Sequence, residues 1–441
     1  MTTSGQTGIL NPVSTITRPV ALAAPAAAAI EVIPAPRTIE DTGIRRKVLE
    51  DLCLKILHLS GELTLRDLAE RMHVPLRIVD ELFGRLRKEG LCQVTGMAAG
   101  VHRIITTSEG KSRAAELLAM TQYAGPVPVA LEDYVDRVKA QTVRNLHVDP
   151  SAVKQAFSHL VLRETTVTQL GTALASGRAI FLYGPPGTGK TTIAECMWQL
   201  FGNDAIWVPY AVEADGQIIE VFDPGVHRPV SQPDAHDQDG RWVRCQRPRV
   251  MVGGELTVDM LDLQYNPASK YYTAPVQMKA SNGILIIDDF GRQRVRPDEL
   301  LNRWVVPLDR SIDFLTLAGG RKIEIPFDML VVFATNLDPA SLVDDAFLRR
   351  IQSKIQLDSV TRDDFHEIFR RVCAERQLEY QHAPVERLLD VIMTDLGQPL
   401  RPCHPRDIVQ QVLWTARYRQ QKPQLDDESL ALACRTYFVA R

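Results

Sequence analysis

The sequence predicts an α/β fold: a parallel β-sheet in the middle of the chain, with a small helix-rich domain before it and an all-α domain after it. Three observations predict this arrangement. The runs Ile180–Tyr183 and Ile284–Ile287 are continuously apolar, as in strands that are buried on both faces of a parallel sheet. Apolar residues recur with a helical period between residues 44 and 120. The same period returns after residue 357, so helices are expected at both ends.

Composition excludes several classes of protein. A chain of 441 residues allows about two to four domains. Its 51 Lys and Arg against 54 Asp and Glu leave no overall attraction for nucleic acid, so DNA binding would need a local basic patch. The seven cysteines form no CxxC pair, which argues against a disulfide scaffold or a structural zinc and favours a cytoplasmic protein. The Ala/Pro-rich run 19–36 lacks a basic start and is interrupted by prolines, so we expect no membrane insertion.

The first part of the chain is expected to divide into a tail, a small domain and a linker. Residues 1–43 contain few large apolar side chains and are predicted to form a disordered tail. In residues 44–120, a helix, a helix-turn-helix, two short extended runs and a closing helix follow one another, and this order resembles a winged-helix domain. Residues 121–145, which include Gly125, Pro126 and Pro128, are predicted to be a linker.

The second helix of the turn is the one that contacts DNA in many such domains. Here it mixes Arg85, Arg87 and Lys88 with Asp80 and Glu81, and residues 44–120 carry 13 basic and 10 acidic side chains. This face is not a phosphate-binding stripe. Both a protein contact and a DNA contact stay open at this point, and the protein contact is favoured.

The apolar run Ile180–Tyr183 leads directly into a glycine-rich loop and then into an amphipathic helix. The loop and the start of the helix are Gly184, Pro185, Pro186, Gly187, Thr188, Gly189, Lys190, Thr191 and Thr192. Glycines in this pattern let backbone N–H groups surround a β-phosphate at a helix N-terminus. Lys190 supplies a positive charge for the β- and γ-phosphates, and the Thr191 hydroxyl is a ligand for Mg²⁺. The motif therefore predicts binding of ATP with Mg²⁺.

A pair of acids, Asp288 and Asp289, ends the second apolar run. A P-loop enzyme needs a carboxylate on the metal side and a second group that orients the attacking water. We assign the metal side to Asp288 and the water to Asp289. A solvated turn is the alternative, but four consecutive branched apolar residues before the pair favour a central strand.

With these motifs in place, residues 146–441 resemble the AAA+ ATPases. The resemblance implies that Asn336, at the end of the apolar run 331–336, helps to position the water. It also implies that Arg350, or its neighbour Arg349, is an arginine finger that reaches the γ-phosphate in an adjacent subunit, and that Arg406 senses the nucleotide from a helical lid. The chain departs from the family at Asp289, where most members have Glu. The shorter side chain leaves open whether hydrolysis is fast.

Two runs on either side of Gly319–Gly320, 311–317 and 321–325, alternate as in a β-hairpin. A hairpin before the Asn336 strand resembles the pre-sensor-1 β-hairpin group of AAA+ proteins, and the order of motifs resembles MoxR-like bacterial ATPases with chaperone activity. The long segment 214–281 is unusual at its position. Its tyrosines are candidates either for a pore surface or for core packing, and a metal site at its His and Asp residues is disfavoured because no ligand spacing is present.

The sequence thus predicts an AAA+ core over residues 146–357 and a helical lid over residues 358–441. The resemblance implies a ring of identical subunits, a hexamer, that uses ATP and Mg²⁺ to remodel an unidentified protein partner recruited through the winged helix. One alternative is a DNA-associated ATPase or transcription regulator that binds duplex through the winged helix. A second alternative is an ATP-gated scaffold with weak hydrolysis.

Overall fold

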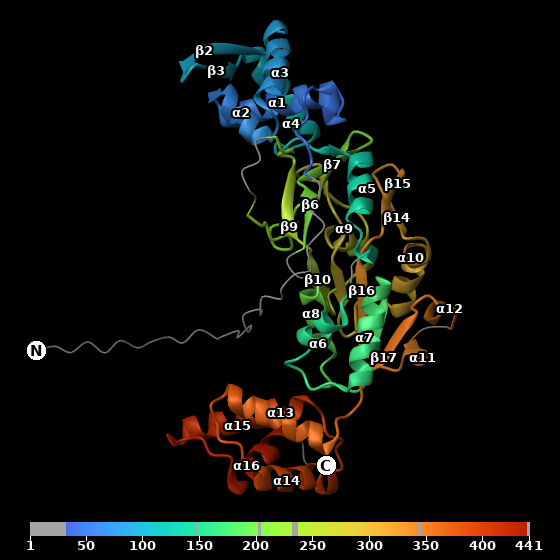
Figure 1. Ribbon diagram of the computed structural model, residues 1–441. Coiled ribbons are helices and arrows are strands. Elements are labelled where there is room, and N and C mark those ends of the chain that lie inside the picture. Colours follow the sequence, from blue (N-terminus) through green and yellow to red (C-terminus); the bar gives the residue numbers. More distant parts are fainter. Residues whose placement is uncertain (1–31, 146–147, 202–203, 232–236, 343–344, 439–441) are drawn as a thin grey trace, which may run out of the picture.

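The computed structural model describes residues 32–145, 148–201, 204–231, 237–342 and 345–438. Figure 1 shows three parts in a row: a helix-rich domain in blue, an α/β core in green and yellow, and a helical domain in orange and red. Most of the predicted tail, residues 1–31, lies outside the described residues. Among the helices that are described, none combines the length and the apolar character that a bilayer crossing requires.

The N-terminal domain packs helices against a small antiparallel sheet of order β1-β3-β2. Its elements are α1 (Arg46–Ser60), β1 (Leu63–Thr64), α2 (Leu65–Met72), α3 (Leu76–Lys88), β2 (Cys92–Ala98), β3 (Val101–Thr106) and α4 (Ser108–Met120). Thr64 caps α2, because its Oγ1 accepts a hydrogen bond from Asp67 N and the Asp67 carboxylate accepts one from Thr64 N. The order of these elements, a helix, a helix-turn-helix, two strands and a closing helix, is the order that the residue pattern predicts.

The predicted start of structure at residue 44 is wrong. Residues 32–43 belong to the folded part: Ile39 is buried in the core of the N-terminal domain, and a short 3₁₀ helix covers Glu40–Thr42. Arg241, 199 residues away, donates a hydrogen bond from Nη1 to Thr42 O at 2.7 Å. This segment is ordered by partners distant in sequence, which its own composition does not reveal.

The predicted linker over residues 121–145 is also wrong. It contains β4 (Val129–Ala130), α5 (Leu131–Ala140) and a 3₁₀ turn at Val143–Asn145. Strand β4 pairs in parallel with a strand more than 80 residues later, and Tyr134 of α5 is buried in the core. Glycine and proline at residues 125–128 therefore mark a turn into the core and not a separate flexible segment.

The central sheet has the order β10-β13-β16-β5-β17, and all four of its pairings are parallel. Its strands are β5 (Ile180–Tyr183), β10 (Arg249–Val252), β13 (Ile284–Ile287), β16 (Leu330–Thr335) and β17 (Ser353–Gln356). Helices around it are α6 (Pro150–Ala156), α7 (Glu164–Ser176), α8 (Lys190–Gln199), α10 (Pro297–Arg310), α11 (Pro339–Leu342) and α12 (Asp345–Leu348). Since all strands run in the same direction, the ends that carry the predicted site lie at one edge of the sheet.

The segment 214–281 contributes to a second sheet of order β11-β12-β8-β7-β4, next to the N-terminal domain. Besides β4, this sheet contains β7 (Ala211–Ala214), β8 (Gln217–Glu220), β11 (Gln264–Asn266) and β12 (Tyr271–Thr273). A separate antiparallel pair is formed by β6 (Ala205–Pro209) and β9 (Trp242–Gln246), and α9 (Val276–Lys279) follows β12. Tyr272 is buried, and its hydroxyl accepts a hydrogen bond from Ala318 N at 2.6 Å, so it packs in the core and does not line a pore. The predicted hairpin is present as β14 (Ile312–Thr316) and β15 (Lys322–Pro326).

His227, in the same segment, is buried by its neighbours. Its Nδ1 accepts a hydrogen bond from Asp223 N at 2.9 Å, and its Nε2 lies 3.0 Å from Lys279 O. Both ring nitrogens are thus occupied by the backbone. His236, the second histidine of the segment 214–281, lies outside the described residues.

The C-terminal domain is helical, with its own apolar core. Its helices are α13 (Arg362–Glu375), α14 (His382–Asp390), a π-helical turn (Val391–Asp395), α15 (Cys403–Tyr418) and α16 (Asp427–Tyr437). The predicted boundary at residue 357 falls between β17 and α13. The fold class expected from the sequence, an α/β P-loop core with a parallel sheet and a C-terminal all-α domain, is confirmed.

Candidate functional site

The loop between β5 and α8 has a backbone that only glycine adopts readily. Gly184, Gly187 and Gly189 have φ values of 141°, 80° and 87°. A Cβ at Gly184 would lie 2.1 Å from Leu357 O, which no side chain can accommodate. The glycines of the motif are therefore required by the conformation and by the close approach of the chain, and the loop wraps around the N-terminus of α8.

Lys190, the first residue of α8, points into this loop. Its side chain is largely buried, and Nζ donates hydrogen bonds to Gly184 O at 2.9 Å and Pro185 O at 2.7 Å. Burial lowers the pKa of Lys190, while the carboxylates of Asp288 and Asp289 act in the opposite direction. The ammonium group is thus held at the centre of the loop, where a bound phosphate would meet it.

The remaining loop residues surround this centre. Thr188 is buried and donates a hydrogen bond from Oγ1 to Pro185 O at 3.0 Å. Pro185 and Pro186 are exposed on the outer turn of the loop. Thr192 is half-buried in the first turn of α8. The structure therefore keeps the predicted loop residues together in one short segment.

The two predicted metal ligands are in contact. Thr191 donates a hydrogen bond from Oγ1 to Asp288 Oδ2 at 2.9 Å, although 97 residues separate them. Strand β13 brings Asp288 to the edge of the sheet from which α8 starts. Both side chains offer oxygen atoms, the type of donor that Mg²⁺ prefers, so the residues present fit this ion.

Asp289 and Asn336 also meet. Asn336 follows β16, which lies between β5 and β13 in the sheet, and its Nδ2 donates to Asp289 Oδ1 at 2.9 Å. Asp289 has a φ of 48°, in the left-handed region that residues with a Cβ seldom adopt. This conformation turns the chain sharply away from β13 as it leaves the edge of the sheet, and Asn336 holds the exposed carboxylate.

An arginine that the sequence analysis did not single out approaches the loop from the helical domain. Arg401 lies beside Gly187: a Cβ built there would be 3.6 Å from Arg401 Cδ, and Cys403 N donates to Gly187 O at 3.3 Å. Its Nε is buried and has no hydrogen-bond partner among the described residues. The charge of Arg401 also contributes to lowering the pKa of Lys190. Hydrophobic periodicity could not predict a role for Arg401, because this residue lies before α15 begins and is followed by Pro402.

Arg406, the predicted sensor in that domain, lies in the first turn of α15 and is exposed. Within the described part of the chain it makes no hydrogen bond or ion pair. Of the two arginines, Arg401 is the one that the structure places against the phosphate-binding loop. The role of Arg406 stays a prediction.

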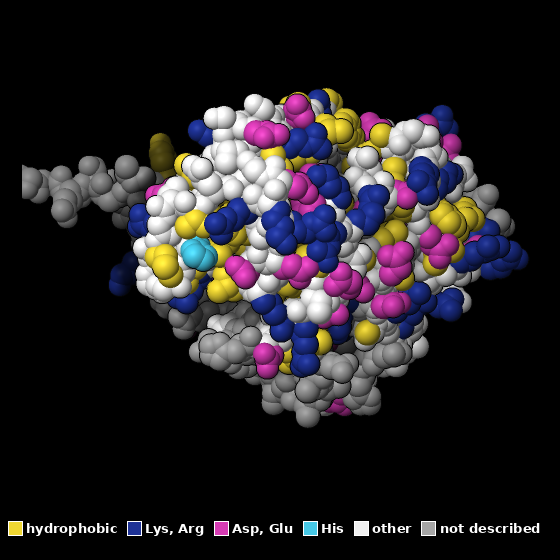
Figure 2. Space-filling model, turned by 90° about the horizontal axis from the view of Figure 1, so that it is seen from above, with side chains coloured by type: hydrophobic (Ala, Val, Ile, Leu, Met, Phe, Trp, Pro, Cys, Tyr) yellow, Lys and Arg dark blue, Asp and Glu magenta, His cyan; other side chains and the backbone are white. Residues whose placement is uncertain are grey.

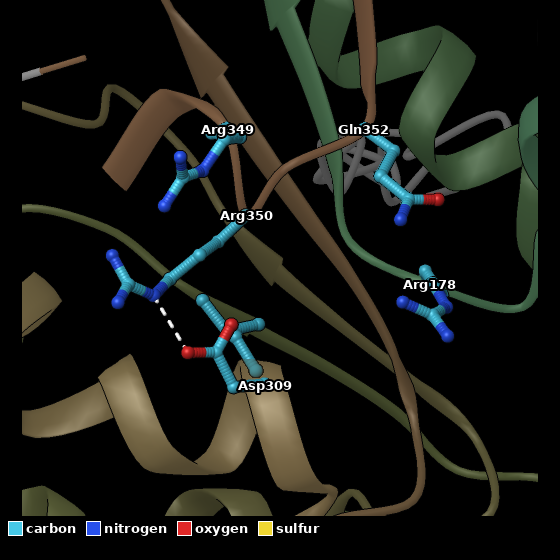
Figure 3. A pocket seen from close by; sticks show the side chains of 6 residues that line it. Arg178, Asp309, Arg349, Arg350 and Gln352 are labelled. Atoms are coloured by element: carbon cyan, nitrogen blue, oxygen red, sulfur yellow. Dashed lines mark hydrogen bonds and ion pairs between the residues drawn. The ribbon is translucent and has the colours of Figure 1, made fainter. Parts of the chain in front are cut away.

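Arg349 and Arg350 lie at the other edge of the sheet. Figure 3 shows them in a polar pocket with Arg178, Asp309 and Gln352, and Arg350 Nε donates to Asp309 Oδ2 at 2.8 Å. Arg350 precedes β17 and Arg178 precedes β5, whereas the phosphate-binding loop follows β5. From Arg178 to Gly184, across β5, the chain advances six residues, which span roughly 20 Å when nearly extended. Neither Arg349 nor Arg350 is therefore positioned to reach the loop of its own chain.

Comparisons with known proteins cover parts of the chain. Residues 361–436 match a family described as a domain of unknown function, DUF8689. No curated protein matches the sequence. The family match falls within the helical C-terminal domain and includes α13 to most of α16.

Several solved structures resemble the chain at low sequence identity. NtrX from Brucella abortus in complex with ADP has a TM-score of 0.40 and 15% identity, over 66% of this chain and 59% of that one. The RuvB Holliday junction branch migration motor of Thermotoga maritima has a TM-score of 0.36 and 16% identity, over 62% of this chain and 69% of that one. Domain III of the Thermotoga maritima replication initiation protein DnaA has a TM-score of 0.36 and 13% identity, over 67% of this chain and 100% of that one. The chain thus spans about three fifths of NtrX, and the assignment of the site rests on the geometry described above.

Proposed function

We propose that the chain is an ATPase of the AAA+ superfamily. The observation that carries this proposal is the convergence of Lys190, the Thr191–Asp288 pair and the Asp289–Asn336 pair at one edge of a parallel sheet. The sheet, the glycine loop and the helix N-terminus together form the kind of site that binds phosphates. Each of these groups has a place in phosphoryl transfer.

In this proposal Lys190 binds the β- and γ-phosphates, and Thr191 and Asp288 hold Mg²⁺, which neutralises phosphate charge when bound. Asp289 orients the attacking water, and Asn336 keeps the Asp289 carboxylate in place. Arg401 contacts the phosphates from the helical domain when that domain lies over the loop, as it does here. Arg406 is the alternative for this last role.

The chain would act as a ring of identical subunits, a hexamer, in the cytoplasm. The position of Arg349 and Arg350 supports an oligomer, because these arginines can serve a nucleotide only in another subunit. Arg350 is the proposed finger and Arg349 its rival. The pocket that holds them is then part of an interface, and the site is incomplete in a single chain.

The work of this motor would be the remodelling of a protein partner, as in MoxR-like chaperones, recruited by the winged-helix domain. Two basic side chains of α3 are engaged within the molecule: Arg77 donates to Pro36 O at 2.9 Å, and Arg85 pairs with the buried Glu50 at 3.1 Å. In Figure 2, which views this end of the molecule, basic and acidic side chains are interspersed. A mixed surface of this kind favours a protein partner over the DNA alternative.

Nucleotide chemistry is tested with Lys190→Ala and Asp289→Asn. We expect Lys190→Ala to lose ATP binding, and Asp289→Asn to bind Mg·ATP normally while releasing no phosphate. Retention of binding and turnover by Lys190→Ala would refute the proposal. Comparing the parent with Asp289→Glu tests the scaffold alternative: a large gain in steady-state turnover would show that the short carboxylate limits hydrolysis.

Partner choice is tested separately. The Asp289→Asn chain, loaded with ATP, should retain a protein partner, and the full chain should bind duplex DNA weakly or not at all at low salt. Tight duplex binding that weakens steeply with salt would support the DNA alternative.

A further inference from the structure

The C-terminal domain contains a cluster of side chains that the proposed ATPase does not use. His366 on α13 faces His382 and Glu386 on α14, and one ligating atom from each of the three lies within 4.8 Å of the others. His382 and Glu386 are four residues apart and so lie on the same face of their helix. Two helices thus direct two imidazoles and one carboxylate toward a shared space.

We propose that His366, His382 and Glu386 form a site for a zinc ion that joins α13 to α14. Zinc accepts imidazole nitrogen and carboxylate oxygen at about 2.0–2.2 Å, and three protein ligands leave a fourth position for water. The three donor atoms lie within 4.8 Å of one another, so they must approach each other further before all three can bind one ion.

Neighbouring side chains orient two of the three ligands. The His366 Nδ1 lies 2.7 Å from the Tyr380 hydroxyl, which leaves Nε2 facing Glu386 Oε2 at 2.5 Å. The other oxygen of Glu386 accepts a hydrogen bond from Arg362. Hydrogen bonds behind the ligands are the usual means of fixing their orientation at a metal site.

The third ligand, His382, is the movable one. Its ring stacks on that of His366 with centroids 4.4 Å apart and an interplanar angle of 8°. Parallel rings cannot share one metal through their in-plane lone pairs, so His382 must turn out of the stack. It is exposed and makes no hydrogen bond within the described residues, so the rotation breaks no polar contact. The exposed side also gives the ion a path to the site.

The test is a titration of the full chain with Zn²⁺, without nucleotide, by isothermal calorimetry. We expect one site in the parent, and an affinity at least 10-fold lower in His382→Ala, which keeps the His366–Glu386 hydrogen bond and the fold. His102→Ala, which removes an exposed histidine of β3, is the matched control and should bind as the parent does. Circular dichroism checks that the variants are folded.

Glu386→Gln provides a second variant, because it keeps the size of the side chain and removes its charge; it should also weaken binding. Co²⁺ serves as a spectroscopic probe and should show d–d bands without the near-ultraviolet bands of a thiolate ligand. Absence of a stoichiometric site in the parent, equal affinity in His382→Ala, or thiolate bands would overturn the proposal. ATP binding by His382→Ala should be normal, so the zinc site and the ATPase proposal stand or fall independently.

Discussion

Replacing Arg350 by alanine tests whether this arginine acts on the nucleotide of a neighbouring subunit. Arg350 precedes β17, whereas the phosphate-binding loop of the same subunit follows β5, so the length of a strand, roughly 20 Å, separates them. A single chain that carries Arg350→Ala should therefore bind ATP as tightly as the parent. An arginine finger supplied by a neighbour contributes roughly 10³–10⁵ to kcat, or about 4–7 kcal/mol of transition-state stabilisation. We expect a loss of kcat in this range with no loss of ATP affinity.

The assay is steady-state phosphate release, with ATP affinity measured in parallel on the same preparation. Arg349→Ala is the matched control, because it removes the same charge one residue away in the same pocket. Mixing inactive Arg350→Ala with inactive Asp289→Asn should restore activity. In a randomly mixed ring, roughly a quarter of the interfaces combine an intact finger with an intact Asp289.

Three results would refute this reasoning. Loss of ATP affinity in Arg350→Ala would mean that the residue acts within its own subunit. A kcat within 10-fold of the parent would mean that it is not the finger, and a large loss in Arg349→Ala instead would transfer the role to its neighbour. Failure of the mixture to recover any activity would argue against action between subunits.

Three further predictions concern other parts of the molecule. Arg401→Ala should weaken ATP binding more than ADP binding, measured with fluorescent nucleotides, and equal affinities in variant and parent would contradict a contact with the phosphates. Arg241→Met should lower the free energy of unfolding by about 3–5 kcal/mol, because it leaves the buried Asp239 carboxylate unpaired; urea unfolding measures this, and the double variant with Asp239→Asn should recover part of the loss. Burial lowers the pKa of His227 to about 4, so between pH 6.5 and 4 the unfolded chain binds more protons and stability should fall as the pH falls, by on the order of 3 kcal/mol. A pH dependence of urea unfolding that is the same in His227→Asn would contradict this assignment.

The parts of the fold that were predictable are those in which a local pattern carries the whole signal. The glycine loop, the apolar strands β5 and β13 and the hairpin around Gly319–Gly320 all depend on neighbours within a few residues. The predicted tail and linker failed for the opposite reason. Residues 32–43 and 121–145 are ordered by partners such as Arg241 and β7, which lie about 80 to 200 residues away.

The same division holds at the site. The sequence alone predicted Lys190, Thr191 and the Asp288–Asp289 pair as site residues, because phosphate and metal binding demand particular residue types at a fixed spacing from a strand. It could not show that Asn336 would donate to Asp289, since that contact depends on β16 lying between β5 and β13.

Only the tertiary structure decided three matters: that Arg401 lies against the loop, that Arg349 and Arg350 lie at the far edge of the sheet, and that two histidines and a glutamate meet between α13 and α14. The physical reason is common to all three. Chain direction and helix packing determine which distant side chains share a space, and residue type determines only what those side chains can do once they are there.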